Sequence, residues 1–342
     1  MGGDCSRDLR DLPDVAKGLS PLEPAPTRFT VVSSILASMP AAVVRPGASV
    51  RVEELLANPS VVWDLMPTDP APVTRADAAY HASVRERWIE SNQLITLRNL
   101  HFHRQAAERL SRNLPDGAVV LELGAGVGFD AVLALEACPK LGAYLLSEIA
   151  CDLVDYARRS NPTLISDPRV IACCLDGGDL LLQDAQVDRI LMVGALHHLP
   201  DLAKALDEMD RVARPGARLV FAIEPNRRWL AVIASMRPIY RRLFERRAVS
   251  PADEKAEGFV PSEFEEMASR RGWVLEEIVP VWFLAGFAHY GVEVLHRLLR
   301  SERWFALPHG VERLILALDS LLFRIPGVNQ LAWHYTAVFS KP

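Results

Sequence analysis

Residues Val119 to Asp130 have the sequence VVLELGAGVGFD, and the order of features in this stretch sets the expected architecture. A run of apolar residues interrupted by a single carboxylate leads directly into Gly124, Gly126 and Gly128. Glycine lets a backbone approach a ligand closely, and a following helix offers unpaired N–H groups and the positive end of its dipole. The stretch therefore predicts a buried strand, a tight turn and a helix that together hold a small, partly anionic ligand.

Apolar runs suited to buried parallel strands recur along the chain, and helical or turn segments separate them. They lie at 118–123, 143–146, 170–175, 190–193 and 219–223, and two more lie at 273–283 and 331–339. This alternation predicts an α/β fold with a Rossmann-like, doubly wound sheet of seven strands. Ligands of such sheets collect at the carboxyl ends of the strands.

The remaining segments predict additions to this sheet and no second full domain. We expect a flexible leader over 1–27, because it is polar and rich in proline, and an N-terminal helical lead-in and lid over 28–114. The second of these segments includes expected helices at about 76–91 and 96–113. The domain proper is expected over 115–342. Helical insertions at about 226–260 and 285–330, after the fifth and sixth strands, would form the side of the site that holds a second reactant, the acceptor.

Composition narrows the classes of function. The 342 residues carry a net charge of −5, so no global basic field is available for nucleic acid, which we do not expect as a partner. Five cysteines without a C-x-x-C pair favour reduced, partly buried thiols and a cytoplasmic protein. No set of histidines or cysteines has the spacing of zinc ligands, so no metal is expected. The sequence also contains no G-x-S-x-G motif, which argues against a serine hydrolase.

Five motifs in a fixed order carry a resemblance to a known family. They are LELGAGVG (121–128), LLSEIA (145–150), CCLDGGD (173–179), VDRILMVGALHHLPD (187–201) and DEMDRVARPGARLVFAIEP (207–225). Together they resemble the class I S-adenosylmethionine-dependent methyltransferases, in the branch that includes ubiquinone/menaquinone-type and natural-product enzymes. The resemblance is dense over about 118–226 and looser over 250–283 and 331–342. It implies S-adenosyl-L-methionine as cofactor and S-adenosyl-L-homocysteine as product.

The resemblance also implies roles for individual carboxylates. Glu148, at the end of the second strand, would accept both ribose hydroxyls, and Asp176 would accept the adenine amino group, with Asp179 as its competitor. Glu122 would help to hold the methionine ammonium, and a buried carboxylate there predicts a cationic partner. Phe129 stands where a dinucleotide fingerprint has its third glycine, which counts against a nicotinamide cofactor. The full expected cofactor set is Glu122, Leu123, Gly124, Ala125, Gly126, Gly128, Glu148, Ile149, Asp176, Gly177, Gly194 and Ala195.

Methyl transfer needs a base only when the acceptor enters protonated. His197 and His198 directly follow the fourth strand, so either is a candidate for that base. The alternative is a structural role in anchoring the next helix. His101, His103 and His289 are further candidates that only folding could bring close.

The segments outside the cofactor half suggest the acceptor. Residues 227–247 form a basic amphipathic stretch that could contact a membrane, bind an anionic substrate or be a solvated arginine face. Residues 292–307 and 311–325 are strongly apolar on one side, and could wall an acceptor pocket, form a homodimer face or thicken the core.

From these features we expect methyl transfer to oxygen, nitrogen or carbon of a small apolar or aromatic metabolite, natural-product or lipid-like. The alternatives are cyclisation or rearrangement on the same fold, a non-catalytic protein that binds the cofactor, and nicotinamide-dependent oxidoreduction.

Overall fold

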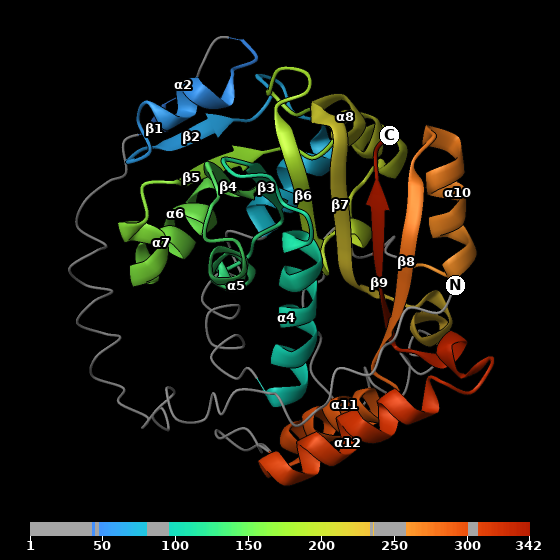
Figure 1. Ribbon diagram of the computed structural model, residues 1–342. Helices are drawn as coiled ribbons and strands as arrows, with labels where there is room; N and C mark the ends of the chain where they lie inside the picture. Colours follow the sequence, from blue (N-terminus) through green and yellow to red (C-terminus); the bar gives the residue numbers. More distant parts are fainter. Residues whose placement is uncertain (1–42, 45–47, 81–95, 233–234, 236–257, 300–306) are drawn as a thin grey trace. The chain divides into compact units, whose positions relative to one another are not determined.

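The computed structural model describes residues 43–44, 48–80, 96–232, 235, 258–299 and 307–342 (Figure 1). All of them belong to one compact unit, Ala41–Pro342. The leader expected over 1–27 lies outside the described residues, as do residues 81–91 of one expected helix and 236–247 of the basic stretch.

The centre of the protein is a single sheet of nine strands in the order β1-β2-β5-β4-β3-β6-β7-β9-β8. Neighbouring strands are parallel from β1 to β7, whereas β9 is antiparallel to both β7 and β8. This confirms the Rossmann-like, doubly wound α/β fold. The seven expected strands are β3 (Val119–Leu123), β4 (Ala143–Glu148), β5 (Val170–Leu175), β6 (Val187–Val193), β7 (Ala213–Pro225), β8 (Val274–Val281) and β9 (His334–Ser340).

The expected total of seven strands is wrong, because β1 (Val43–Val44) and β2 (Val62–Leu65) extend the sheet beyond β5. They lie in the segment expected to be helical, which contains one short helix, α2 (Val52–Leu56), between them. The sequence VVW at 61–63 is β-branched and aromatic, and it suits a strand that covers the edge of β5. Leu65 is fully buried there, so the sheet gains apolar contact that local periodicity does not show.

Helices cover both faces of this sheet, and each face has its own apolar core. One face carries α2, α8 (Leu202–Val212) and α10 (Pro261–Arg271). The other carries α4 (Leu97–Ser111), α5 (Phe129–Ala137), α6 (Cys151–Ser160) and α7 (Pro162–Ser166). Side chains of β3 alternate between the two cores, as the period of two in a strand requires.

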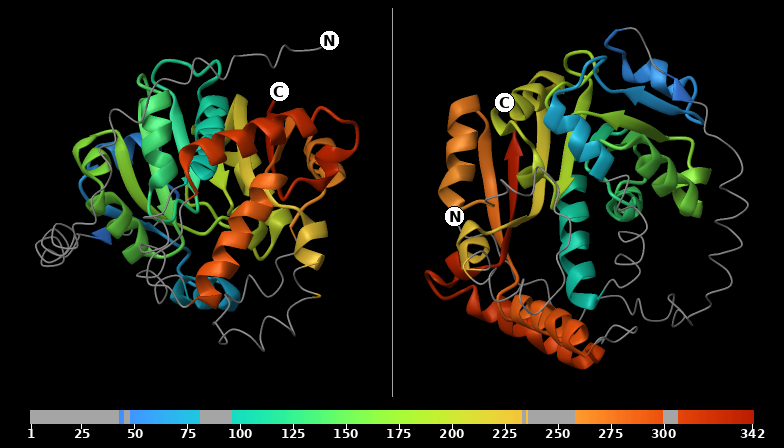
Figure 2. Two further views of the ribbon diagram at one scale, coloured as in Figure 1. Left: turned by 90° about the horizontal axis from the view of Figure 1, so that it is seen from below. Right: turned by 180° about the vertical axis from the view of Figure 1, so that it is seen from behind.

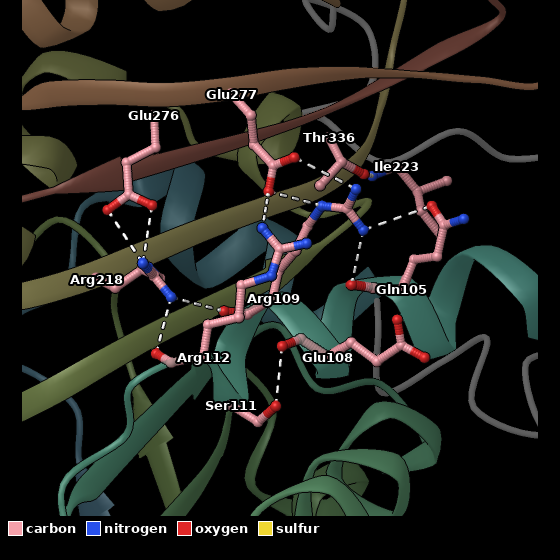
Figure 3. Close-up of polar contacts among 10 residues, drawn as sticks. All are labelled: Gln105, Glu108, Arg109, Ser111, Arg112, Arg218, Ile223, Glu276, Glu277 and Thr336. Carbon is pink, nitrogen blue, oxygen red and sulfur yellow. Dashed lines mark hydrogen bonds and ion pairs between the residues drawn. The ribbon is translucent and has the colours of Figure 1, made fainter. Parts of the chain in front are cut away.

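Helix α4 confirms the helix expected at 96–113, and ion pairs fix it to the antiparallel end of the sheet (Figure 3). The guanidinium groups of Arg109 and Arg112 contact the Glu277 carboxylate on β8, with N–O distances of 3.0 and 2.7 Å. Arg218 on β7 pairs with Glu276 at 2.8 Å and also donates to the Arg112 carbonyl oxygen. The helix therefore has a fixed position beside the glycine loop and β7.

The insertion after β8 consists of α11 (Leu284–Leu298), α12 (His309–Leu322) and the 3₁₀ turn η4 (Val328–Leu331). Figures 1 and 2 show α11 and α12, in orange and red, beyond the lower ends of β7 and β8. Buried Asp319 of α12 accepts hydrogen bonds from the N–H groups of Phe283, Leu284 and Ala285, and so caps the first turn of α11. Buried Arg98 of α4 pairs with Glu312 of α12.

Both helices of this insertion also expose apolar side chains, among them Phe287, Val294, Leu295, Val311, Leu314, Leu318 and Leu321. Among the described residues, none of the helices combines the length and the apolar composition that crossing a bilayer requires.

The cysteines correct one expectation. Cys138 and Cys173 are free and buried, but Cys151 and Cys174 are joined in a disulfide, so the expectation of thiols throughout is wrong for this pair. The sequence does not indicate the pairing, because 23 residues separate the two cysteines, and they meet only because Cys174 on β5 pairs with the end of β4, after which α6 begins at Cys151. Cys173 and Cys174 lie in opposite cores, as neighbours on a strand should.

Candidate active site

The glycine loop between β3 and α5 has the backbone conformation that the sequence predicts. Gly124, Gly126 and Gly128 have φ values of +75°, +55° and +77°, in the left-handed region that favours glycine. A Cβ added at Gly124 would lie 2.7 Å from the Cβ of Ala195, so this position has no room for a side chain. The loop is therefore pressed against the end of β6.

Glu148 lies against this loop from the end of β4. Its carboxylate accepts a hydrogen bond from the Gly126 N–H at 2.7 Å and another from the Ile149 N–H at 3.0 Å. The N–H groups of Gly124 and Ala125 both donate to the Ser147 carbonyl oxygen. The structure thus brings the predicted ribose carboxylate and the predicted glycine loop together, and Glu148 as a whole is 7% exposed.

Glu122 is almost completely buried on β3, and its partner differs from the expected cation. The Tyr144 hydroxyl donates to its carboxylate at 2.7 Å, and that hydroxyl, not a cation, is its partner in the described part of the chain. Burial raises the pKa of Glu122 well above its usual value, and the nearby charges of Asp130 and Glu148 raise it further.

The third carboxylate, Asp176, follows β5 and is already hydrogen-bonded on both oxygens. One oxygen accepts from the Gly178 N–H at 2.9 Å, and the other accepts from the Thr74 hydroxyl at 3.2 Å. Thr74 is buried in the helical residues 72–80, which follow β2. A Cβ added at Gly177 would lie 2.8 Å from the Leu199 side chain, so the turn also packs against the segment after β6. Nothing in the sequence pattern predicts the role of Thr74.

Glu224, at the end of β7, is a site residue that the sequence analysis missed. It is fully buried, and its carboxylate accepts hydrogen bonds from the backbone N–H groups of Ala195, Leu196 and His197. It also lies 2.8 Å from Nδ1 of His197. These contacts fix the 3₁₀ turn η3 (Leu196–His198) directly after Gly194. The available signal was a single carboxylate that ends the apolar run VFAIEP.

The histidines fall into two groups. His197 and His289 lie close to His334, and burial together with the charges of these two histidines lowers the pKa of His334 to about 3. The ring centroids of His197 and His198 are 3.9 Å apart. By contrast, His103 contacts Asp130 at 2.7 Å and His101 contacts Gln105 at 3.0 Å, both from helix α4.

An aromatic cluster surrounds His334. Trp282 contacts the rings of both His289 and His334, while Trp333 stacks on Trp229 with ring centroids 4.3 Å apart. Gly286 of α11 allows this packing, because a Cβ there would lie 2.1 Å from the Trp333 ring. Three buried nitrogens of the cluster have no hydrogen-bond partner among the described residues, namely Nε1 of Trp282, Nε1 of Trp333 and Nδ1 of His334.

The acceptors at the strand ends fit the donors of S-adenosylmethionine. Its ribose hydroxyls, adenine amino group and ammonium group all donate, and Glu148, Asp176 and Glu122 supply three carboxyl groups at this edge of the sheet. Left-handed Gly194 has open space around it, because an added Cβ would meet only the Ile223 carbonyl oxygen, at 3.9 Å. The site can therefore take a ligand that passes close to the backbone.

Comparisons with known proteins agree with this geometry. The pattern of the family described as "Methyltransferase domain" matches residues 121–221. Demethylmenaquinone methyltransferase from Clavibacter sepedonicus is 27% identical over 246 residues, which cover 68% of this chain and 93% of that protein. Malonyl-[acyl-carrier protein] O-methyltransferase from Methylococcus capsulatus is 29% identical over 167 residues, which cover 46% of this chain and 58% of that protein.

Among solved structures, phosphoethanolamine N-methyltransferase 2 of Haemonchus contortus, in complex with S-adenosyl-L-methionine, has the same fold. Its TM-score is 0.51 at 14% identity, with 81% of this chain and 61% of that chain covered. This likeness shows the Rossmann-like fold, and the family match and the curated relatives indicate methyl transfer. Residues 121–221 therefore carry a methyltransferase domain of the class I S-adenosylmethionine-dependent kind, and S-adenosyl-L-methionine is its cofactor.

The raised pKa of Glu122 predicts a specific dependence of stability on pH. Above pH of about 4.5, the ordinary value, the native protein keeps a proton that the unfolded chain releases, so this group lowers stability as pH rises. Glu122→Gln keeps an acceptor for Tyr144 and removes the titration. The stability of Glu122→Gln relative to wild type should therefore increase with pH, by up to about 1.4 kcal/mol per unit, in urea unfolding between pH 5 and 8. A difference that stays constant over this range would contradict the raised pKa.

Proposed function

We propose that this methyltransferase acts on oxygen, nitrogen or carbon of a small apolar or aromatic acceptor, natural-product or lipid-like. The observation that carries the proposal is the aromatic cluster with its three unpaired buried nitrogens. Small-molecule sites combine mostly apolar walls with a few placed polar groups. Trp282 and Trp333 supply apolar walls and N–H donors, and His334 supplies a ring that stays neutral at physiological pH.

The position of this cluster supports the proposal. In the sheet register, His334 on β9 pairs with Pro225 at the end of β7 and with Val281 at the end of β8. It therefore lies at the same edge of the sheet as Gly194 and η3. An acceptor seated there would be next to the turn that the family uses for the methionine part of its cofactor.

The chain's own residues would bind and orient the two reactants. Glu148 and the glycine loop would hold the ribose, Asp176 the adenine amino group, and Glu122 the ammonium group, while Gly194 and Ala195 would line the path of the methionine part. The cofactor supplies an electrophilic methyl group on its sulfonium. The protein contributes orientation and a dry site.

The two relatives differ in the acceptors that their names give, demethylmenaquinone and malonyl-[acyl-carrier protein], so neither name defines the acceptor of this chain. Contact between 227–247 and a membrane gains little support from the described part of that stretch. Arg227 pairs with Glu263 at 2.7 Å and Arg228 donates to Gln330 at 3.0 Å, so both arginines have partners within the protein.

An acceptor panel tests the proposal. The purified protein would be incubated with S-adenosylmethionine labelled in its methyl group and with phenols, quinols and long-chain fatty acids, against polar amines as the contrasting set. We expect S-adenosylhomocysteine release with label that partitions into organic solvent only for the apolar set. Release with the polar amines alone would contradict the proposal. Conversion of an acceptor without S-adenosylhomocysteine release would favour the cyclisation alternative.

We further propose that His197 is the base for acceptors that enter protonated, and that Glu224 is its positioning residue. A histidine oriented by a carboxylate on Nδ1 presents Nε2 to a reacting group. The charge of buried Glu224 would also stabilise the imidazolium that forms after proton transfer. We favour His197 over His198 because the Glu224 carboxylate contacts Nδ1 of His197 at 2.8 Å.

Kinetics separate this role from simple anchoring of η3. His197→Gln should lower kcat at least about a hundredfold, leave KM for the cofactor unchanged and abolish the rise of kcat/KM with pH. His198→Gln should lower kcat less. Replacement of exposed His309 by Gln is the matched control and should have no effect. A His197→Gln protein that loses cofactor affinity and stability but retains its pH profile would assign His197 to structure.

A further inference from the structure

One cluster of chemically reactive side chains lies outside the site described above. Asp64 on β2, Cys174 on β5 and Cys151 at the start of α6 place one carboxylate oxygen and two sulfurs within 4.8 Å of one another. The sheet register explains the juxtaposition, because Asp64 pairs directly with Cys174, and Cys174 pairs with Glu148 on its other side. Cys151 follows three residues after Glu148.

The two sulfurs form a disulfide, and the Cα atoms of Cys151 and Cys174 are 5.1 Å apart. A dithiol reductant supplies two electrons and two protons, which break the S–S bond and yield two thiols while the reductant itself becomes a disulfide. Reduction therefore leaves two thiols and a carboxylate converging on one point. Strand pairing with β5 holds two of the three groups independently of the disulfide.

Two thiolates and one carboxylate form a ligand set that suits zinc. Zn²⁺ takes cysteine sulfur at about 2.3 Å and carboxylate oxygen at about 2.0–2.2 Å in a tetrahedral arrangement, with water as a common fourth ligand. The Met66 N–H donates to the Asp64 carboxylate at 3.2 Å, a contact of the kind that orients metal-binding carboxylates. Cys151 is the first residue of α6, where the helix dipole favours negative charge.

The surroundings allow a cation to enter. A cavity of about 290 Å³ is lined by Asp64 and Cys151 and extends over Met66, Arg75 and Ile149. It has room for a water ligand beside the cluster. Arg75 is the positive group on this cavity wall, and its guanidinium is paired with Asp69 at 2.7 Å. Cys174 is fully buried and Asp64 is 9% exposed, so a bound cation would be largely shielded from solvent.

We propose that in the reduced protein Asp64, Cys151 and Cys174 bind one soft divalent cation, with Zn²⁺ as the best chemical match. Binding replaces the two thiol protons, which are released to solvent. The cation would tie the extra strand β2 to the ends of β4 and β5, which carry Glu148 and Asp176. This proposal does not depend on the identity of the methyl acceptor.

Cobalt provides a spectroscopic test on the full-length protein. Protein reduced with a phosphine and freed of metal would be titrated with Co²⁺, and then with Zn²⁺ as competitor. We expect a thiolate-to-cobalt absorption band that saturates at one Co²⁺ per chain, is displaced by Zn²⁺ and is absent from the oxidised protein. Asp64→Asn should keep the band but weaken Co²⁺ affinity at least about tenfold.

Variants of single cysteines decide the assignment. Cys151→Ser and Cys174→Ser should each remove most of the band, whereas Cys173→Ala, which deletes a thiol from the same strand on the opposite face, should leave it intact. Cys151 is only half-buried, so its replacement should preserve the fold even if that of Cys174 does not. A reduced wild-type protein without the band, or Co²⁺ binding that persists in Cys151→Ser, would overturn the proposal. Neither result depends on methyl transfer.

Discussion

The hydrogen bond from the Gly126 N–H to the Glu148 carboxylate is the contact on which the rest of the site depends. It exists because β3 and β4 are parallel neighbours, so the turn after one and the last residue of the other meet at one edge of the sheet. The turn comes close to this carboxylate because its three left-handed residues are glycines, which have no side chains. The same constraint puts Ala195 against Gly124, and thereby positions η3 and its histidines.

The parts of the fold that local patterns encode were predictable. Buried parallel strands are continuous apolar runs, and helix α10 begins at Pro261 and ends before left-handed Gly272, which are residue types that favour the start and the end of a helix. Strand β2 was not predictable, because the segment VVW is too short to show a period of two and gains its stability from pairing with the edge of β5. The disulfide and the contact of Thr74 with Asp176 were not predicted for a similar reason. Each depends on contacts between segments that are distant along the chain.

The site shows the same division. The glycines and Glu148 lie where the motifs indicate, since their roles depend on backbone conformation and strand order. For Glu122 the sequence does not display the tyrosine hydroxyl on the next strand that is its partner within the described residues, nor the burial and neighbouring negative charge that raise its pKa. Glu224 was missed although it makes four contacts with residues 195–197, because three of them are with backbone N–H groups, which a sequence does not display.

Calorimetric titration with S-adenosylhomocysteine, and separately with NAD, tests the central claim that Glu148 and the glycine loop form the cofactor site. Wild type should bind S-adenosylhomocysteine and not NAD, and Glu148→Ala should lose at least about tenfold in affinity, since two charged hydrogen bonds to the ribose are removed. Replacement of exposed Glu265, on α10, by Ala is the control and should bind as wild type does. Undiminished binding by Glu148→Ala, or a preference for NAD, would contradict the account.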